Sequence, residues 1–411
     1  MTRSVFWCFV VCLLITPFAT AQDENAERRK RLEASREALA SLKPFLGQFA
    51  SEVWTNQENK HHGQGVTDGY GFMGGALLVF DTRIRTTSND NQLQQISEVP
   101  FSRALMQRII VFHDAKRGLV YHRLHAGWGM YDHGTVKHEP NGTLTFLSSE
   151  PPTGYFGDLR RVQWNLAGDT LEVRGAPASE KLPEKPNWRV HRVADESSVQ
   201  AIPLDRSRLR PPTTVSPEEQ QKRAEARQRV ARMFEPFGHL STDYYETSVQ
   251  EHLNARGENR FFVQFLRLVR LSPSRTSLTF SFNVRRQSAE LPKEDLLKKN
   301  YTNTGRVFVM EMIHWNHRKQ RMQETILNPF DPFLHGAWVR DVQLTPEHKI
   351  VVLPGQAPYN TIATFTFHQD GFRIDGTDKD GKPEPIARSW RAKETYKVVP
   401  AEKVTGLTPK P

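Results

Sequence analysis

The stretch TIATFTFHQDGFRIDG, residues 361–376, gives the clearest indication of the fold. Phe365 and Phe367 alternate with polar residues, which is the pattern of a β-strand that buries one of its two faces. A short Gln-Asp-Gly segment then turns the chain into a second run that begins at Phe372. The stretch therefore predicts an antiparallel hairpin whose phenylalanines lie in a core.

Short runs of the same kind fill most of the chain on either side. Asn141-Gly142 is the clearest of the turns between them, because both residues tolerate positive φ. The predicted strands include residues 108–113, 118–125, 143–148, 160–166 and 170–175, and in the second half residues 307–315 and 321–327. Consecutive short strands with tight turns indicate an antiparallel meander, and we favour a closed barrel over a sandwich for it.

The two halves of the chain resemble each other at nearly constant spacing. The recurring pairs are His133-Gly134 with His335-Gly336 and Trp188-Arg189 with Trp390-Arg391, both 202 residues apart, and Pro44-Phe45 with Pro236-Phe237, 192 residues apart. A helical stretch rich in arginine and glutamate precedes each Pro-Phe pair. The sequence therefore predicts a mainly β protein of two tandem antiparallel β-barrels, each preceded by one α-helix.

These landmarks also divide the chain into segments. We expect a signal peptide at 1–21, a helix and first barrel at 22–196, a linker at 197–216, a helix and second barrel at 217–400, and a tail at 401–411. Ser216 is a suitable N-cap for the second helix, and Pro217 fits its first position. Cutting the chain between Arg210 and Ser216 is therefore expected to give two separately folding pieces.

The first residues are typical of a secretory signal. Arg3 precedes an apolar run at 5–15, and Ala19-Thr20-Ala21 forms an A-x-A cleavage site. We expect a secreted or periplasmic protein, cleaved near Ala21 and without a transmembrane segment. Both cysteines, at positions 8 and 12, lie in this signal, so the mature chain offers no disulfide, cysteine-ligated zinc or cysteine nucleophile.

The charge limits the kinds of partner. The chain carries a formal net charge of +10 at pH 7. Because an exported protein rarely meets nucleic acid, an acidic polymer of the cell envelope is the better candidate partner. The basic residues are scattered, however, which favours charge that serves only solubility.

Three features together resemble the calycin-type barrels, which include the lipocalins and related uncharacterised bacterial secreted proteins. They are the stretch LKPFLGQFASEVW at 42–54, the glycine-rich segment at 69–75 and the closing Trp-Arg strand. The resemblance implies that Trp54 on the first strand stacks with Arg189 on the last. It also implies a small apolar or amphipathic ligand inside each barrel. The second half has Tyr244 and Tyr245 in place of the tryptophan and retains Arg391.

The ligand-binding candidates surround the recurring His-Gly pair. If this segment forms a rim loop, aromatic side chains in each half would line a barrel mouth, although core packing explains the same residues. The candidates for binding are Trp128, Tyr131, His133, Phe333 and His335. The candidates for a structural role, with arginine placed over indole, are Trp54, Trp188, Arg189, Trp390 and Arg391.

Catalytic and metal motifs are missing from the sequence. It contains no Gly-x-Ser-x-Gly, no His-Glu-x-x-His and no phosphate-binding Gly-x-x-x-x-Gly-Lys. His122 and His125 are three residues apart, which places them on opposite faces of a strand and prevents joint chelation. We therefore expect no catalytic residue, no metal and no cofactor.

Three hypotheses of function remain. The first is a non-catalytic binding protein whose barrels hold small apolar or amphipathic ligands. The second is a structural or interaction protein of the envelope, with filled barrels and a basic surface for acidic polymers. The third is a barrel enzyme, which would need a buried acid–base pair that the sequence does not show.

Overall fold

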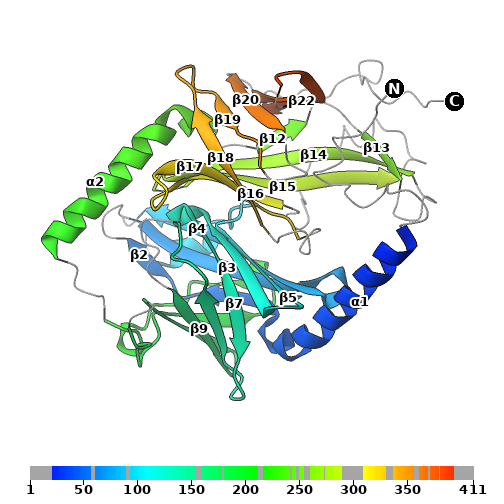
Figure 1. Cartoon of the computed structure of the whole chain (residues 1–411). Coiled ribbons are helices and arrows are strands. Elements are labelled where there is room, and N and C mark those ends of the chain that lie inside the picture. The colour runs from blue at the N-terminus through cyan, green and yellow to red at the C-terminus, as the bar shows by residue number, and fades with distance from the viewer. Residues whose placement is uncertain are drawn as a thin grey trace.

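The computed structural model describes residues 21–392 apart from several gaps. The gaps are 57–60, 89–92, 154–159, 178–179, 212–215, 241–242, 247–249, 254–259, 273, 289–308, 330–336, 356–360, 369–370 and 379. Residues 1–20, which belong to the predicted signal peptide at 1–21, and residues 393–411, which include the predicted tail at 401–411, also lie outside the described residues. Two antiparallel sheets and two long helices make up most of the described part, so the mainly β prediction is confirmed (Figure 1).

The first sheet closes into a barrel. Its strands are β1 Gly47–Ser51, β2 Trp54–Asn56, β3 His61–Phe72, β4 Leu77–Ser88, β5 Gln107–Asp114, β6 Gly118–His125, β7 Met130–His138, β8 Leu144–Ser148, β9 Arg161–Ala167, β10 Thr170–Ala176 and β11 Trp188–Val193. Each strand from β3 to β11 pairs with the next along the chain, and β1 pairs with both β11 and β3. The ring therefore has ten strands, and the short β2 lies on β3 outside it.

The chain in front of β1 closes one end of this barrel. Helix α1, Ala21–Leu39, continues into the 3-10 turn Ala40–Phe45, and the apolar side chains of Leu39, Leu42 and Phe45 join the barrel core. The Ser35 hydroxyl donates to the carbonyl of Ala76 at 2.7 Å, which fixes the helix against the turn between β3 and β4. We call Leu39, Leu42 and Phe45 the plug.

Aromatic side chains fill the middle of the barrel above the plug. Trp164 lies 5.1 Å from Phe80 and 4.8 Å from Phe146 between ring centroids, and Tyr121 lies 5.2 Å from Phe146. All four rings are buried. The plug and these rings therefore occupy one end and the middle of the first barrel.

The second sheet has the same strand order as the first and curls in the same way. Its strands are β12 Asp243–Glu246, β13 Gln250–Leu253, β14 Arg260–Leu271, β15 Ser277–Ser288, β16 Val309–Asn316, β17 Arg321–Leu327, β18 Ala337–Leu344, β19 Ile350–Val352, β20 Ile362–His368, β21 Gly371–Thr377 and β22 Pro383–Ala392. The predicted hairpin is β20–β21, in which Phe367 pairs with Phe372. Phe365 and Phe372 are buried in the core of this sheet, so this prediction is confirmed.

Helix α2, Pro217–Phe234, precedes the second sheet as α1 precedes the first (Figure 1). The Ser216 hydroxyl accepts a hydrogen bond from the backbone N–H of Glu219 at 3.2 Å, which confirms the predicted N-cap. Phe234 at the end of the helix and Phe237 in the following turn, Glu235–Leu240, are buried in the core of the second sheet. Within the described part of the chain, neither helix has the length and apolarity that a membrane crossing requires.

Much of the segment assigned to the linker packs on the first barrel. Val199 and Ile202 lie against Ala50 and Val66 on the outer face of β1 and β3. The backbone N–H of Val53 donates to the carbonyl of Ile202 at 2.8 Å. The described part of the linker is therefore attached to the first barrel rather than free between two units.

The two sheets share an apolar interface. Met310, Met312 and Leu327 on β16 and β17 join a single buried cluster with the outer face of the first barrel, which includes Phe112 and Leu124. Further contacts are the Leu105 N–H to the Ser281 hydroxyl at 3.3 Å, the His317 N–H to the Thr153 carbonyl at 3.1 Å, and the ion pair of Arg318 with Glu150 at 3.2 Å.

This shared cluster changes the expected outcome of cutting the chain between Arg210 and Ser216. We expect the two parts to stay together in solution, because separation would expose the methionine and leucine side chains that the interface buries. Size-exclusion chromatography after cleavage at an inserted protease site checks this. Met312→Asp should release the parts, whereas Val339→Asp on the exposed face of β18 should not. Elution of two separate folded halves from the wild-type protein would contradict the shared interface.

Candidate functional site

The end of the first barrel opposite the plug carries the candidate site. We call this end the mouth; strands β4, β6, β8 and β10 end there, and β5, β7, β9 and β11 begin there. Three of the chain's eight tryptophans lie at the mouth, Trp54, Trp128 and Trp188. Each is 37% exposed, which is unusual for so large an apolar side chain.

The three indoles stand on different parts of the rim. Trp188 begins β11 opposite Val173, a residue of the barrel core, and so faces the inner side. Trp54 begins β2 opposite Gly63. Trp128 lies in the turn between β6 and β7, halfway around the ring from β1 and β11, and stacks on His125 with ring centroids 4.3 Å apart.

Gly63 makes the position of Trp54 possible. A Cβ atom at residue 63 would lie 2.0 Å from the indole of Trp54, whereas a Cβ at Gly65 would meet its nearest neighbours at 3.7 Å. The indole therefore lies flat against β3 because residue 63 has no side chain. The side chain is nevertheless 37% exposed at the mouth.

The Gly63→Ala substitution is expected to displace the Trp54 indole and to increase its exposure. Acrylamide quenching of tryptophan fluorescence should increase relative to the wild type, with a small change in stability because Trp54 is already partly exposed. Gly65→Ala is the matched control on the same strand and should leave quenching unchanged. Equal quenching of the two variants would show that the indole does not lie on Gly63.

A buried polar layer lies directly below the rim. Asp132 and Arg123 face each other on β7 and β6, and Asp132 Oδ2 accepts from Arg123 Nη2 at 2.6 Å and from the Tyr121 hydroxyl at 2.7 Å. Because Tyr121 lies in the barrel core, Arg123 two residues further on also faces the interior. Among the described residues, Asp132 Oδ1 and Arg123 Nε make no hydrogen bond.

His125 adds a further polar atom to this region. It follows Arg123 by two residues on β6 and therefore faces the same side. Burial, together with the charge of Arg123, lowers the pKa of His125 to about 3, so the ring is neutral at physiological pH. Its Nδ1 makes no hydrogen bond to another described residue.

The second unit holds the Trp128 turn in place. Ser274, in the β14–β15 turn, donates to the carbonyl of Gly127 at 2.8 Å, and Ser277, the first residue of β15, donates to that of Ala126 at 2.6 Å. Gly129 has φ +55° and lies where a Cβ would meet the Thr276 carbonyl at 2.9 Å. The mouth of the first barrel is therefore supported by both units.

The predicted ligand-binding residues fall into two places. Trp128 lies at the mouth, whereas Tyr131 and His133 lie on the outer face of β7. There they stack with His122, with ring centroids between 5.5 and 6.1 Å apart, and the Tyr131 hydroxyl contacts His122 Nδ1 at 2.8 Å. Burial lowers the pKa of His122 to about 3. Phe333 and His335 lie outside the described residues.

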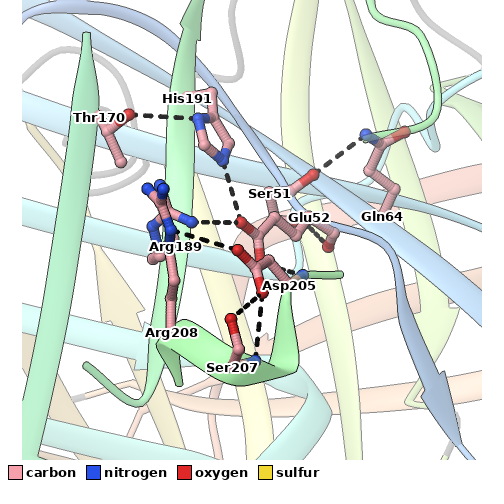
Figure 2. A network of polar contacts seen from close by, with 9 residues as sticks. All are labelled: Ser51, Glu52, Gln64, Thr170, Arg189, His191, Asp205, Ser207 and Arg208. Atoms are coloured by element: carbon pink, nitrogen blue, oxygen red, sulfur yellow. Dashed lines mark hydrogen bonds and ion pairs between the residues drawn. The ribbon is translucent and has the colours of Figure 1, made fainter. Parts of the chain in front are cut away.

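Arg189 pairs with a carboxylate, and its predicted stacking partner Trp54 lies over Gly63. Figure 2 shows the Glu52 carboxylate between Arg189 Nη1 at 3.1 Å and His191 Nε2 at 3.2 Å. The backbone N–H of Asp205 donates to the same carboxylate at 3.4 Å. This network ties β1, β11 and the segment after β11 together on the outer face. The side chains of Trp390 and Arg391 lie outside the described residues.

The second sheet contains a buried charge cluster of its own. Glu324 on β17 pairs with Arg340 on β18 at 2.6 Å, and these strands correspond to β6 and β7 of the first sheet, where the pair is Arg123 with Asp132. The two sheets thus place an ion pair on equivalent strands with the charges exchanged. Glu311 on β16 lies beside Glu324, and both carboxylates are 1% exposed.

This cluster is surrounded by aromatic rings. The Arg267 guanidinium lies 4.0 Å from the ring centroid of Phe282 and 5.7 Å from that of Phe280. Burial, with the adjacent Glu324 carboxylate, raises the pKa of Glu311 to about 8. A buried acid beside a carboxylate is the arrangement that the enzyme hypothesis requires, and the sequence did not indicate it.

The sequence did contain one signal for the layer below the mouth. Tyr121, Arg123 and His125 alternate along β6, so they share one face of that strand. Asp132 joins them only through the pairing of β6 with β7. The register of this pairing depends on the turn between the two strands, whose form the sequence left open. Among the described residues, no group of three or more histidines or carboxylates is placed to hold a metal ion.

Comparisons with known proteins give little further information. The sequence matches no known protein-family model and no curated protein. Among solved structures, it is similar to a protein of unknown function from the DUF3598 family of Nostoc punctiforme. That alignment covers 87% of this chain and 98% of the other, at 8% identity and a TM-score of 0.17.

Proposed function

We propose that the protein is a binding protein whose first barrel takes a small amphipathic molecule at its mouth. The observation that carries this proposal is the position of Trp54, Trp128 and Trp188 around the rim, above buried polar atoms that make no hydrogen bond to described residues. Apolar surfaces with a few convergent polar groups are typical of small-molecule sites.

The shape of the barrel limits the size of the ligand. A ring of ten strands is slightly wider than the eight-stranded rings that hold one small molecule. The plug and the rings of Phe80, Phe146 and Trp164 occupy the lower and middle parts. The ligand would place an apolar part between the indoles and a polar group against the Arg123–Asp132 layer.

The proposal extends to the class of the two barrels, their origin and the location of the protein. We infer that both units are calycin-type barrels derived from one repeated unit and that the protein is exported. The shared strand order, the helix before each sheet and the signal-like N-terminal sequence support this inference.

Binding of 8-anilinonaphthalene-1-sulfonate tests the proposal, because this fluorescent probe is itself small and amphipathic. We expect Trp128→Ala to weaken its binding about fivefold, and Trp54→Ala combined with Trp188→Ala to weaken it about thirtyfold, since each aromatic contact contributes roughly 1 kcal/mol. Val339→Ala removes exposed apolar surface from the second unit and is the control. Unchanged binding in the tryptophan variants would overturn the proposal.

A further inference from the structure

We propose that the ligand of the mouth is an uncharged, flat molecule with an amide-like edge, and that this edge binds between Asp132 and Arg123. In such an edge an N–H group lies beside a carbonyl, as in a lactam. The inference rests on the proposed function and names the chemical class of the ligand.

A comparison of two buried ion pairs in the same barrel carries the argument. Arg108 donates two hydrogen bonds to Asp81, from Nε to Oδ1 at 2.7 Å and from Nη2 to Oδ2 at 2.7 Å. Both oxygens of the Asp81 carboxylate are therefore paired with the guanidinium. Arg123 holds Asp132 with one bond only, Nη2 to Oδ2 at 2.6 Å. Arg123 Nε and Asp132 Oδ1 make no hydrogen bond to described residues, whereas the equivalent atoms of Arg108 and Asp81 are hydrogen-bonded to each other.

These two atoms require complementary partners. Asp132 Oδ1 accepts a hydrogen bond and Arg123 Nε donates one, so a ligand edge with one donor and one acceptor side by side satisfies both. Asp132 is 2% exposed and Arg123 is 9% exposed, and buried polar groups of this kind normally have partners. The pair of Arg108 and Asp81, on the outer face of the same barrel, has both oxygens of its carboxylate joined to the guanidinium.

The charges of the layer favour a neutral ligand. The positive charge of Arg123 and the negative charge of Asp132 compensate each other, and the lowered pKa of His125 leaves that ring uncharged. Arg160, just before β9, is a further cation near this end, and its Nη2 donates to the carbonyl oxygens of Ser148 and Ser149 at 3.5 and 3.4 Å. The indoles above provide flat surfaces for a ring attached to the amide edge.

Isothermal titration of the full chain with quinolin-2(1H)-one and its 1-methyl derivative tests the inference. The two probes share a flat bicyclic ring and a carbonyl, and only the first has the N–H. We expect the N–H probe to bind at least about tenfold more tightly, because methylation leaves Asp132 Oδ1 without its donor. Asp132→Asn should reduce this difference, whereas Asp195→Asn at an exposed turn should preserve it.

The outcomes separate this inference from the proposed function. Equal affinity of the wild-type protein for both probes, lowered by Trp128→Ala, overturns the amide edge and keeps the mouth as a binding site. Tighter binding of quinoline-2-carboxylate than of the quinolinone overturns the neutral class. No binding of any probe, with one ordered water between Asp132 and Arg123 in a crystal structure, overturns the inference and leaves only a water site. If Asp132→Asn fails to fold by circular dichroism, the probe pair on the wild type decides alone.

Discussion

Replacing Glu311 with glutamine is expected to raise the free energy of unfolding at pH 8 to 9 by several kcal/mol. The carboxyl group of Glu311 is buried beside that of Glu324, and both effects raise its pKa to about 8. Glutamine has nearly the same shape and carries no charge at any pH. The substitution therefore removes the cost of ionising this group inside the second sheet.

The direction of the pH dependence follows from proton binding in the two states. Between about pH 4.5 and pH 8 the folded protein keeps a proton on Glu311 that the unfolded chain has lost, so stability falls as pH rises. The slope from this group is at most about 1.4 kcal/mol per pH unit. The stabilising contribution of protonated Glu311 is complete below about pH 4.5 and is lost as the pH rises through 8.

Urea unfolding of wild type and Glu311→Gln at pH 5, 7 and 9 measures this effect. The two proteins should differ least at pH 5 and most at pH 9. Glu347→Gln, at an exposed turn of the same unit, should follow the wild type at each pH. If the free energies of unfolding of wild type and Glu311→Gln changed in parallel with pH, Glu311 would be ionised in the folded protein across this range.

Truncating the plug is expected to lower the free energy of unfolding by a similar amount at every pH. Phe45→Ala should lower the free energy of unfolding by about 3–5 kcal/mol, because it removes a buried ring and leaves a cavity beneath Trp164. Thermal unfolding followed by circular dichroism measures the loss. Val339→Ala, at an exposed position, should change the midpoint little.

A small effect of Phe45→Ala would mean that the plug does not close the barrel. A ligand could then enter from that end, and the argument that confines binding to the mouth would fail. Binding of 8-anilinonaphthalene-1-sulfonate to the same variant distinguishes these cases. We expect Phe45→Ala to keep the wild-type affinity for the probe as long as the protein is folded.

Local patterns predicted the elements of this fold well. The alternation in residues 361–376 and the Ser216-Pro217 start of α2 depend on neighbours in sequence, and both predictions are confirmed. The sequence did not show what the Pro-Phe pairs do. Phe45 and Phe237 fill the cores of the first and second sheets, which depends on contacts distant in the chain.

The candidate site was harder to predict for the same reason. Trp54 and Trp188 lie on neighbouring parts of the rim only because β1 joins β11 to β3 and so closes the ring. Asp132 meets Arg123 through the register of β6 and β7, and a slip of one residue would turn Asp132 outward. Tyr131 and His133 looked like rim residues in sequence, yet their place on β7 puts them outside the barrel.

Native mass spectrometry of the gently purified full chain shows whether the mouth of the first barrel holds a ligand. Wild-type protein and a variant in which Trp54, Trp128 and Trp188 are all alanine would be compared under native and denaturing conditions. We expect an extra mass on the wild type that disappears on denaturation and is absent from the folded variant. The same extra mass on both proteins would contradict binding at the mouth.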